Sequence, residues 1–152
     1  MRKSDQLNMV IADDDADDRL LIEDAFQECC LSTQRDYVGD GAELLEYLRA
    51  EEKWSHRDAS ALPSIILLDL NMPRMDGRTA LAHIKADPVL KRIPVVVLTT
   101  SKADEDIART YDLGVNSFIT KPVTFAGLVD AVQALNDFWL ENVQLPSQFE
   151  AA

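Results

Sequence analysis

The segment 64–77, SIILLDLNMPRMDG, decides the fold. It begins with an uninterrupted aliphatic run, which is typical of a strand buried on both faces at the centre of a parallel sheet. The run ends at an acidic residue, Asp69, and a turn rich in Pro and Gly follows. Because a strand buried on both faces needs a layer of helices on each side, this segment predicts the central strand of an α/β protein.

The same pattern recurs on both sides of this segment. Short apolar runs alternate with longer stretches in which apolar residues recur at helical spacing, the last from Phe125 to Trp139. This alternation predicts a flavodoxin-like, doubly wound parallel sheet of five strands with helices on both faces. The expected strands are residues 9–12, a weaker one near Tyr37 and Val38, and residues 64–70, 93–100 and 116–120.

Composition narrows the function classes. The 152 residues, 47% of them apolar, suit a single domain. Fifteen basic against 27 acidic residues give a net charge of −12, which opposes binding to nucleic acid and to anionic membranes. No aliphatic run approaches the roughly 18–20 residues that span a bilayer. The adjacent Cys29 and Cys30 are poorly placed for an unstrained disulfide, and no secretory signal is visible, so we expect a cytoplasmic chain.

Polar residues gather where the expected strands end. In doubly wound sheets, ligands bind beyond the carboxyl ends of the strands, so these side chains should converge on one site. Clustered carboxylates suit a hard cation such as Mg²⁺, and a lysine with a hydroxyl beside them suits a phosphoryl group. The residues are Asp13, Asp14 and Asp15 after the first strand, Asp69 after the third, Thr99 and Thr100 at the fourth, and Lys121 after the fifth. Asp15 is better explained as the N-cap of the first helix. Asp17 and Asp18 then lie in its first turn, where their negative charges interact favourably with the helix dipole.

Four strings carry a family resemblance. VIADDD, IILLDLNMPRMDG, VVVLTTS and FITKPV stand in the order and spacing of response-regulator receiver domains. The resemblance extends from Met9 to about Leu140, and it implies a receiver domain over residues 1–141 with a C-terminal tail at residues 142–152.

The resemblance also implies a function. A partner histidine kinase would donate a phosphoryl group to the nucleophile Asp69, with Mg²⁺ or Mn²⁺ as cofactor. The protein would be a phosphoacceptor that signals through protein contacts, catalysing only its own phosphoryl transfer and dephosphorylation. The implied metal ligands are Asp13, Asp14, Asp69 and the backbone carbonyl of Asn71; the implied phosphoryl contacts are Thr99, Lys121 and, as a lesser contact, the backbone amide of Thr100.

Two further expectations come with the family. The peptide bond between its lysine and the following proline is typically cis, which here would aim Lys121 inward. The family switch couples a hydroxyl with an aromatic ring, here Thr99 and Phe118. Because Phe118 replaces the Tyr of many relatives, it lacks the phenolic hydrogen bond of the active state.

The C-terminal part suggests a narrower relationship. The connection EEKWSHRDASALPS, the segment LTTSKADEDI and the aromatic tail resemble stand-alone receivers that serve bacterial phytochromes, in which dimers are common. The last helix and tail carry apolar residues beyond those needed to cover one sheet face, so we expect a homodimer through them. The alternative is that the tail folds back on its own domain.

Two other functions fit parts of the pattern. Phosphatases and phosphomutases that form an aspartyl phosphate also use Asp, Mg²⁺ and Lys, but their nucleophile lies on the first strand with a second Asp two residues later, where this chain has Asn71. A module of the same fold that never accepts phosphate would not need all four strings.

Overall fold

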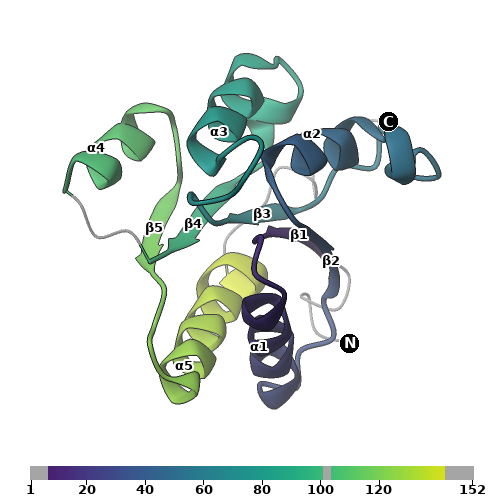
Figure 1. Cartoon of the computed structure of the whole chain (residues 1–152). Coiled ribbons are helices and arrows are strands. Elements are labelled where there is room, and N and C mark those ends of the chain that lie inside the picture. The colour runs from purple at the N-terminus through teal and green to yellow at the C-terminus, as the bar shows by residue number, and fades with distance from the viewer. Residues whose placement is uncertain (1–6, 101–103, 143–152) are drawn as a thin grey trace.

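The computed structural model describes residues 7–100 and 104–142, which form one parallel sheet between two layers of helices (Figure 1). The strand order is β2-β1-β3-β4-β5, and all neighbours pair in parallel. This confirms the expected flavodoxin-like fold. The strands are β1 (Asn8–Ala12), β2 (Gln34–Val38), β3 (Ile65–Leu68), β4 (Val95–Thr99) and β5 (Ser117–Thr120).

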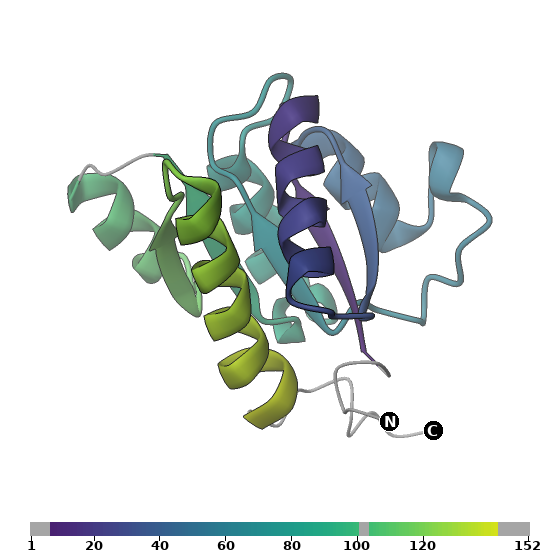
Figure 2. The same ribbon diagram turned by 90° about the horizontal axis from the view of Figure 1, so that it is seen from below.

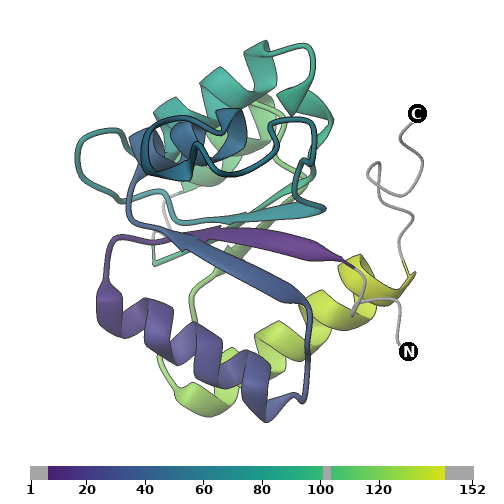
Figure 3. The same cartoon turned by 90° about the vertical axis from the view of Figure 1, so that its right-hand side faces the viewer.

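The helices divide between the two faces of the sheet. Figures 2 and 3 show α1 (Ala16–Glu28) and α5 (Phe125–Leu135) side by side on one face. The other face carries α2 (Gly41–Arg49), α3 (Gly77–Ala86) and α4 (Asp104–Asp112). Two short 3-10 helices, Glu52–Trp54 and Leu90–Arg92, lie in the connections that follow α2 and α3.

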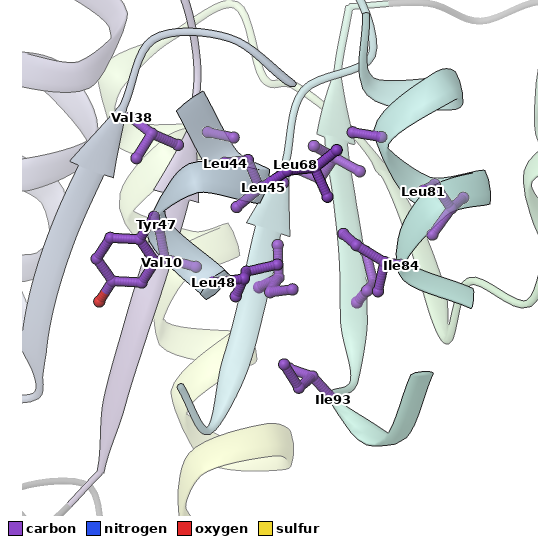
Figure 4. Close-up of a cluster of buried hydrophobic side chains, with 14 of the residues drawn as sticks. Val10, Val38, Leu44, Leu45, Tyr47, Leu48, Leu68, Leu81, Ile84 and Ile93 are labelled. Carbon is purple, nitrogen blue, oxygen red and sulfur yellow. The ribbon is translucent and has the colours of Figure 1, made fainter. Parts of the chain in front are cut away.

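Strand β3 supplies both halves of the core. Its four residues are fully or almost fully buried, and successive side chains point to opposite faces of the sheet. Ile66 and Leu68 pack in the cluster under α2 and α3, part of which Figure 4 shows. Ile65 and Leu67 pack in the cluster under α1 and α5. The next residue after this buried strand is Asp69, which therefore emerges at the carboxyl edge of the sheet.

Polar caps start the helices at the same edge. The side chain of Asp15 accepts hydrogen bonds from the backbone N–H groups of Asp17 and Asp18 at 2.8 and 3.2 Å, which confirms its role as the N-cap of α1. Asp40, Asp76 and Thr124 cap α2, α3 and α5 in the same way. These helix starts therefore lie beside the strand ends that carry the candidate site residues.

The last helix differs from the single amphipathic helix expected from Phe125 to Trp139. Helix α5 ends at Leu135, and a π-helical segment, Asn136–Asn142, continues it. Leu135 and Leu140 are five residues apart, which matches the i→i+5 spacing of a π-helix, and both are buried in the α1–α5 cluster. Leu140 therefore belongs to the core of this domain.

Two findings on the described residues concern membrane association and the cysteines. None of the helices in the described ranges is long and apolar enough to cross a membrane. Cys29 and Cys30 are thiols and do not form a disulfide. The expected tail, residues 142–152, lies outside the described residues except for Asn142.

Candidate functional site

Three sequence-distant side chains meet at the carboxyl edge of the sheet. Asp13 follows β1, Asp69 follows β3 and Lys121 follows β5. The ammonium nitrogen of Lys121 lies 2.8 Å from Asp13 Oδ2 and 3.5 Å from Asp69 Oδ2. All three side chains are at most 10% exposed, so their charges interact with little screening by water. The predicted convergence of Asp13, Asp69 and Lys121 is therefore present.

The acidic residues of this edge form a candidate metal site. Carboxylate oxygens of Asp13, Asp14 and Asp69 all lie within 4.8 Å of one another, and Asp14 is the exposed member. Three carboxylates in this arrangement fit the oxygen ligands that Mg²⁺ and Mn²⁺ prefer. Asn71 lies in the following loop, where its backbone N–H donates to Asp69 Oδ1 at 3.3 Å.

Burial and charge act on this cluster in opposite directions. Burial raises the pKa of Asp13 above its usual value, and the negative charge of Asp69 adds to that effect. The Lys121 hydrogen bond and the backbone N–H of Asp15, which donates to Asp13 Oδ1 at 3.0 Å, oppose it. Burial disfavours the charged form of Lys121, yet its hydrogen bond to Asp13 and the charges of Asp69 and Asp13 outweigh burial and raise its pKa. Lys121 is therefore a fixed positive charge among carboxylates.

The loop between β3 and α3 is held closely against Asp69. The N–H of Gly77 donates to Leu70 O at 2.9 Å, and a Cβ at Gly77 would lie 2.2 Å from Asp69 O. Only glycine fits there. Within the loop, Arg74 has a positive φ of 59° and forms a two-point ion pair with Asp40, at 2.8 and 3.1 Å. These contacts fix the backbone that carries Asp69.

The expected switch residues lie on the α3–α4 face of the sheet. Thr99 is fully buried at the end of β4, and its carbonyl accepts the N–H of Lys121 at 2.7 Å. Phe118 lies opposite Val97 on β5 and packs against the α2–α3 cluster that contains Val97. Since Thr99 is two residues from Val97, Thr99 and Phe118 share one face. Thr100, the expected lesser phosphoryl contact, is exposed just beyond the strand.

The expected cis bond before Pro122 is wrong: this bond is trans in the structure. Lys121 points into the site nonetheless. Its backbone is fixed by the hydrogen bond to Thr99 O, and its ammonium is fixed by the acidic side chains.

Asp18 is a residue of the site that the sequence does not predict. The sequence suggests for it only a favourable interaction with the helix dipole, but in the structure it accepts a hydrogen bond from Lys121 Nζ at 3.0 Å. Its position in the first turn of α1, five residues after Asp13, places it at this edge of the sheet. A surplus of acidic residues in that turn is the signal that sequence alone offers.

A doubly wound sheet with this acidic edge and a lysine after its last strand defines a response-regulator receiver. The chain belongs to that family: the family model described as the response regulator receiver domain matches residues 9–133. It is therefore a phosphoacceptor signalling protein, as expected, and its nucleophile candidate follows the central third strand. The family match and the position of Asp69 after the third strand, instead of the first, both distinguish this chain from the phosphatases and phosphomutases.

Within the receiver family, the chain is similar over most of its length to individual response regulators. The chain is 39% identical over 139 residues to response regulator Rcp1 of Synechocystis sp. (strain ATCC 27184 / PCC 6803 / Kazusa), an alignment that covers 91% of this chain and 92% of Rcp1. The crystal structure of the phosphorylated cyanobacterial phytochrome response regulator RcpA has a TM-score of 0.84 and 41% identity, covering 92% of this chain and 98% of RcpA. The Mn²⁺-bound form of Rcp1 has a TM-score of 0.83 and 36% identity, covering 92% and 99%. The chain is therefore akin to phytochrome response regulators. Asp13, Asp14 and Asp69 form a divalent metal site, and the related Rcp1 has an Mn²⁺-bound form.

Proposed function

We propose that Asp69 is the phosphoacceptor and that Lys121 and the acidic pair Asp13 and Asp14 support the transfer. The observation that carries this assignment is the position of Lys121 Nζ, which contacts both Asp13, the residue after β1, and Asp69, the residue after β3. Asp69 is the carboxylate at the end of the central strand, with one oxygen oriented by the Asn71 N–H and the other facing Lys121.

The chemistry is attack of a carboxylate on phosphorus. An Asp69 oxygen forms a bond to phosphorus while the phosphorus–nitrogen bond of a phosphohistidine breaks. The electron pair goes to the imidazole nitrogen, which takes up a proton from solvent, and Asp69 becomes an acyl phosphate. Repulsion between the carboxylate and the phosphoryl oxygens opposes this step, and the positive charge of Lys121 reduces it.

Asp13, Asp14, Asp69 and the Asn71 carbonyl are the residues proposed to hold a divalent cation. A bound Mg²⁺ or Mn²⁺ supplies positive charge that neutralises the phosphoryl oxygens. The chain prepares that position because the Asp15 N–H orients Asp13 and the Asn71 N–H orients Asp69.

Thr99 and Phe118 are proposed to report the phosphoryl group to the surface. The Thr99 hydroxyl and the Thr100 amide contact phosphoryl oxygens, and movement of Thr99 opens space on the face it shares with Phe118. Phosphorylation then shifts the population toward a packing in which the ring turns inward. The surface that changes is formed by α4, β5 and α5.

The donor is proposed to be a histidine kinase, and the likeness to Rcp1 and RcpA supports a phytochrome in that role. We propose that the phosphoryl transfer takes place in the cytoplasm, and the thiols of Cys29 and Cys30 support this because cysteines stay reduced there.

A homodimer through the end of α5 and the tail completes the proposal. Phe138 is 57% exposed and forms an edge-to-face pair with Trp139, so an aromatic surface is present near the C-terminal end of the described residues. Sedimentation equilibrium on the full chain tests this: a dimer that Phe138→Ser weakens supports the assignment, and a monomer at all concentrations rejects it.

Intact-mass measurement tests the phosphoacceptor. Incubation with Mg²⁺ and phosphoramidate should add one phosphoryl group to the wild type and none to Asp69→Asn. An unlabelled wild type, or equal labelling of the variant, contradicts the assignment of Asp69.

A further inference from the structure

The ammonium group of Lys121 has three acceptors in this structure. It donates to Asp13 Oδ2 at 2.8 Å, to Asp18 Oδ2 at 3.0 Å and to Asp69 Oδ2 at 3.5 Å. An ammonium has three donors, so these contacts use all of them. The longest contact is the one to Asp69, so Lys121 is held mainly by the two carboxylates beside the proposed phosphoacceptor.

The two closer partners differ in burial. The Asp13 side chain is 2% exposed, whereas that of Asp18 is 36% exposed. Removing the partner of a buried carboxylate leaves an uncompensated charge, which is strongly unfavourable. A carboxylate at the surface is hydrated when its partner leaves. Lys121 therefore separates from Asp18 more readily than from Asp13.

The surroundings of Asp18 allow Lys121 to separate from it. A pocket of about 70 Å³ borders the pair and is lined in part by Leu21, Pro122 and Phe125. Leu21 and Phe125 are 44% and 42% exposed, so the pocket meets solvent. Asp18 itself is fixed on α1, because its backbone N–H donates to the cap residue Asp15.

We propose that Asp18 is a positioning residue that holds Lys121 away from Asp69 and yields it to the incoming phosphoryl group. This inference rests on the proposed function of Asp69. Asp18 neutralises part of the charge that Lys121 directs at the phosphoryl oxygens, and the ion pair must open before Lys121 closes on them. Asp18 therefore slows phosphorylation without contacting the reacting atoms.

The test compares Asp18→Asn with Asp17→Asn. Asp17 lies in the same helical turn, is exposed, and donates its own N–H to Asp15. Both variants remove one negative charge near the same helix start, so they share every long-range effect. With phosphoramidate and Mg²⁺, Asp18→Asn should be phosphorylated about three- to fivefold faster than Asp17→Asn, because an exposed ion pair is worth up to about 1 kcal/mol. Asp18→Glu, which restores a carboxylate, should return the rate toward that of the wild type.

A spectroscopic signature separates positioning from a change in folding. The ammonium resonance of Lys121, observed by side-chain ¹H–¹⁵N NMR, should shift in Asp18→Asn and stay unchanged in Asp17→Asn. Equal rates in the two Asn variants, or a slower Asp18→Asn, would overturn the role of Asp18. These results are distinct from failure of the proposed function, in which the wild type and Asp17→Asn would not be phosphorylated either.

Discussion

Lys121 donates a hydrogen bond to Asp13 at 2.8 Å, although the two residues lie 108 positions apart in the chain. Strands β3 and β4 separate their two strands in the sheet, so the lysine side chain reaches across the carboxyl edge. The contact places a positive charge beside a carboxylate that is almost fully buried. The proposed phosphoryl site and the stability of the sheet edge therefore depend on the same ion pair.

Replacement of Lys121 should destabilise the protein. Lys121→Met leaves Asp13 buried without its cation and next to Asp69, and loss of one partner of a buried pair costs about 3–5 kcal/mol. Urea unfolding at pH 7 in the absence of divalent metal should show a loss of that order. The double variant Asp13→Asn/Lys121→Met should recover part of it, because the buried charge is then gone.

Lys53→Met is the matched control for this measurement. Lys53 pairs with Glu43 at 2.7 Å, but its side chain is 68% exposed. Exposed pairs contribute about 0–1 kcal/mol. If the two lysine variants lost equal stability, the buried pair would have no special role.

Divalent metal should stabilise the fold through the acidic cluster. A ligand that binds only the folded state at 100 times its Kd adds about 2.7 kcal/mol. We therefore expect Mn²⁺ to raise the Tm of the wild type, and Asp14→Asn to lose most of that rise because it removes one of three clustered carboxylates. Without metal, Asp14→Asn should be at least as stable as the wild type, since repulsion with Asp13 and Asp69 is relieved. Asp17→Asn should keep the full response to Mn²⁺, and a full response in Asp14→Asn would exclude Asp14 as a ligand.

The sequence alone predicts the positions of those site residues that local rules determine. Asp69 and Asp13 each follow a buried run, and parallel strands place their carboxyl ends at one edge, so their convergence follows from strand order. The contact between Asp18 and Lys121 depends instead on how α1 is rotated about its axis and how the β5–α5 connection runs. The ion pair of Arg74 with Asp40 likewise joins two loops whose approach is set by tertiary packing. Periodicity does not determine either relationship.

Gly77→Ala should disturb the proposed phosphoacceptor through its backbone. The added Cβ would lie 2.2 Å from Asp69 O and 2.8 Å from the Cα of Leu70, so the strand end or the start of α3 must move. Overpacking of this kind costs about 1–3 kcal/mol. We expect a lower Tm together with slower phosphorylation by phosphoramidate. At Gly39 the nearest atom to an added Cβ is 3.6 Å away, on the Glu43 side chain, so Gly39→Ala should change neither property; an unchanged Gly77→Ala would contradict the close approach.

Stability at acid pH should depend on Glu23, which ties α1 to β2. Its carboxylate accepts two hydrogen bonds from Arg35, at 2.8 and 2.7 Å, and one from the Tyr37 hydroxyl at 2.7 Å. The Arg35 hydrogen bonds outweigh the effect of burial and, with the Tyr37 bond, lower the pKa of Glu23 from 4.5 to about 2. A carboxyl group whose pKa is lower in the folded state than in the unfolded state stabilises the fold. The full stabilisation is present at pH values above the pKa of the unfolded state, and it is lost as the pH falls toward the pKa of the folded state.

At pH 7 the free energy of unfolding of the wild type should therefore be about 2–3 kcal/mol higher than that of Glu23→Gln. That difference should shrink between pH 4.5 and about pH 2, the interval set by the lowered pKa. Urea unfolding across this pH range measures it. Glu28→Gln, an exposed position on the same helix, should follow the wild-type curve. If the difference in free energy of unfolding between the wild type and Glu23→Gln stayed constant with pH, the charge of Glu23 would not be what stabilises its contact with Arg35.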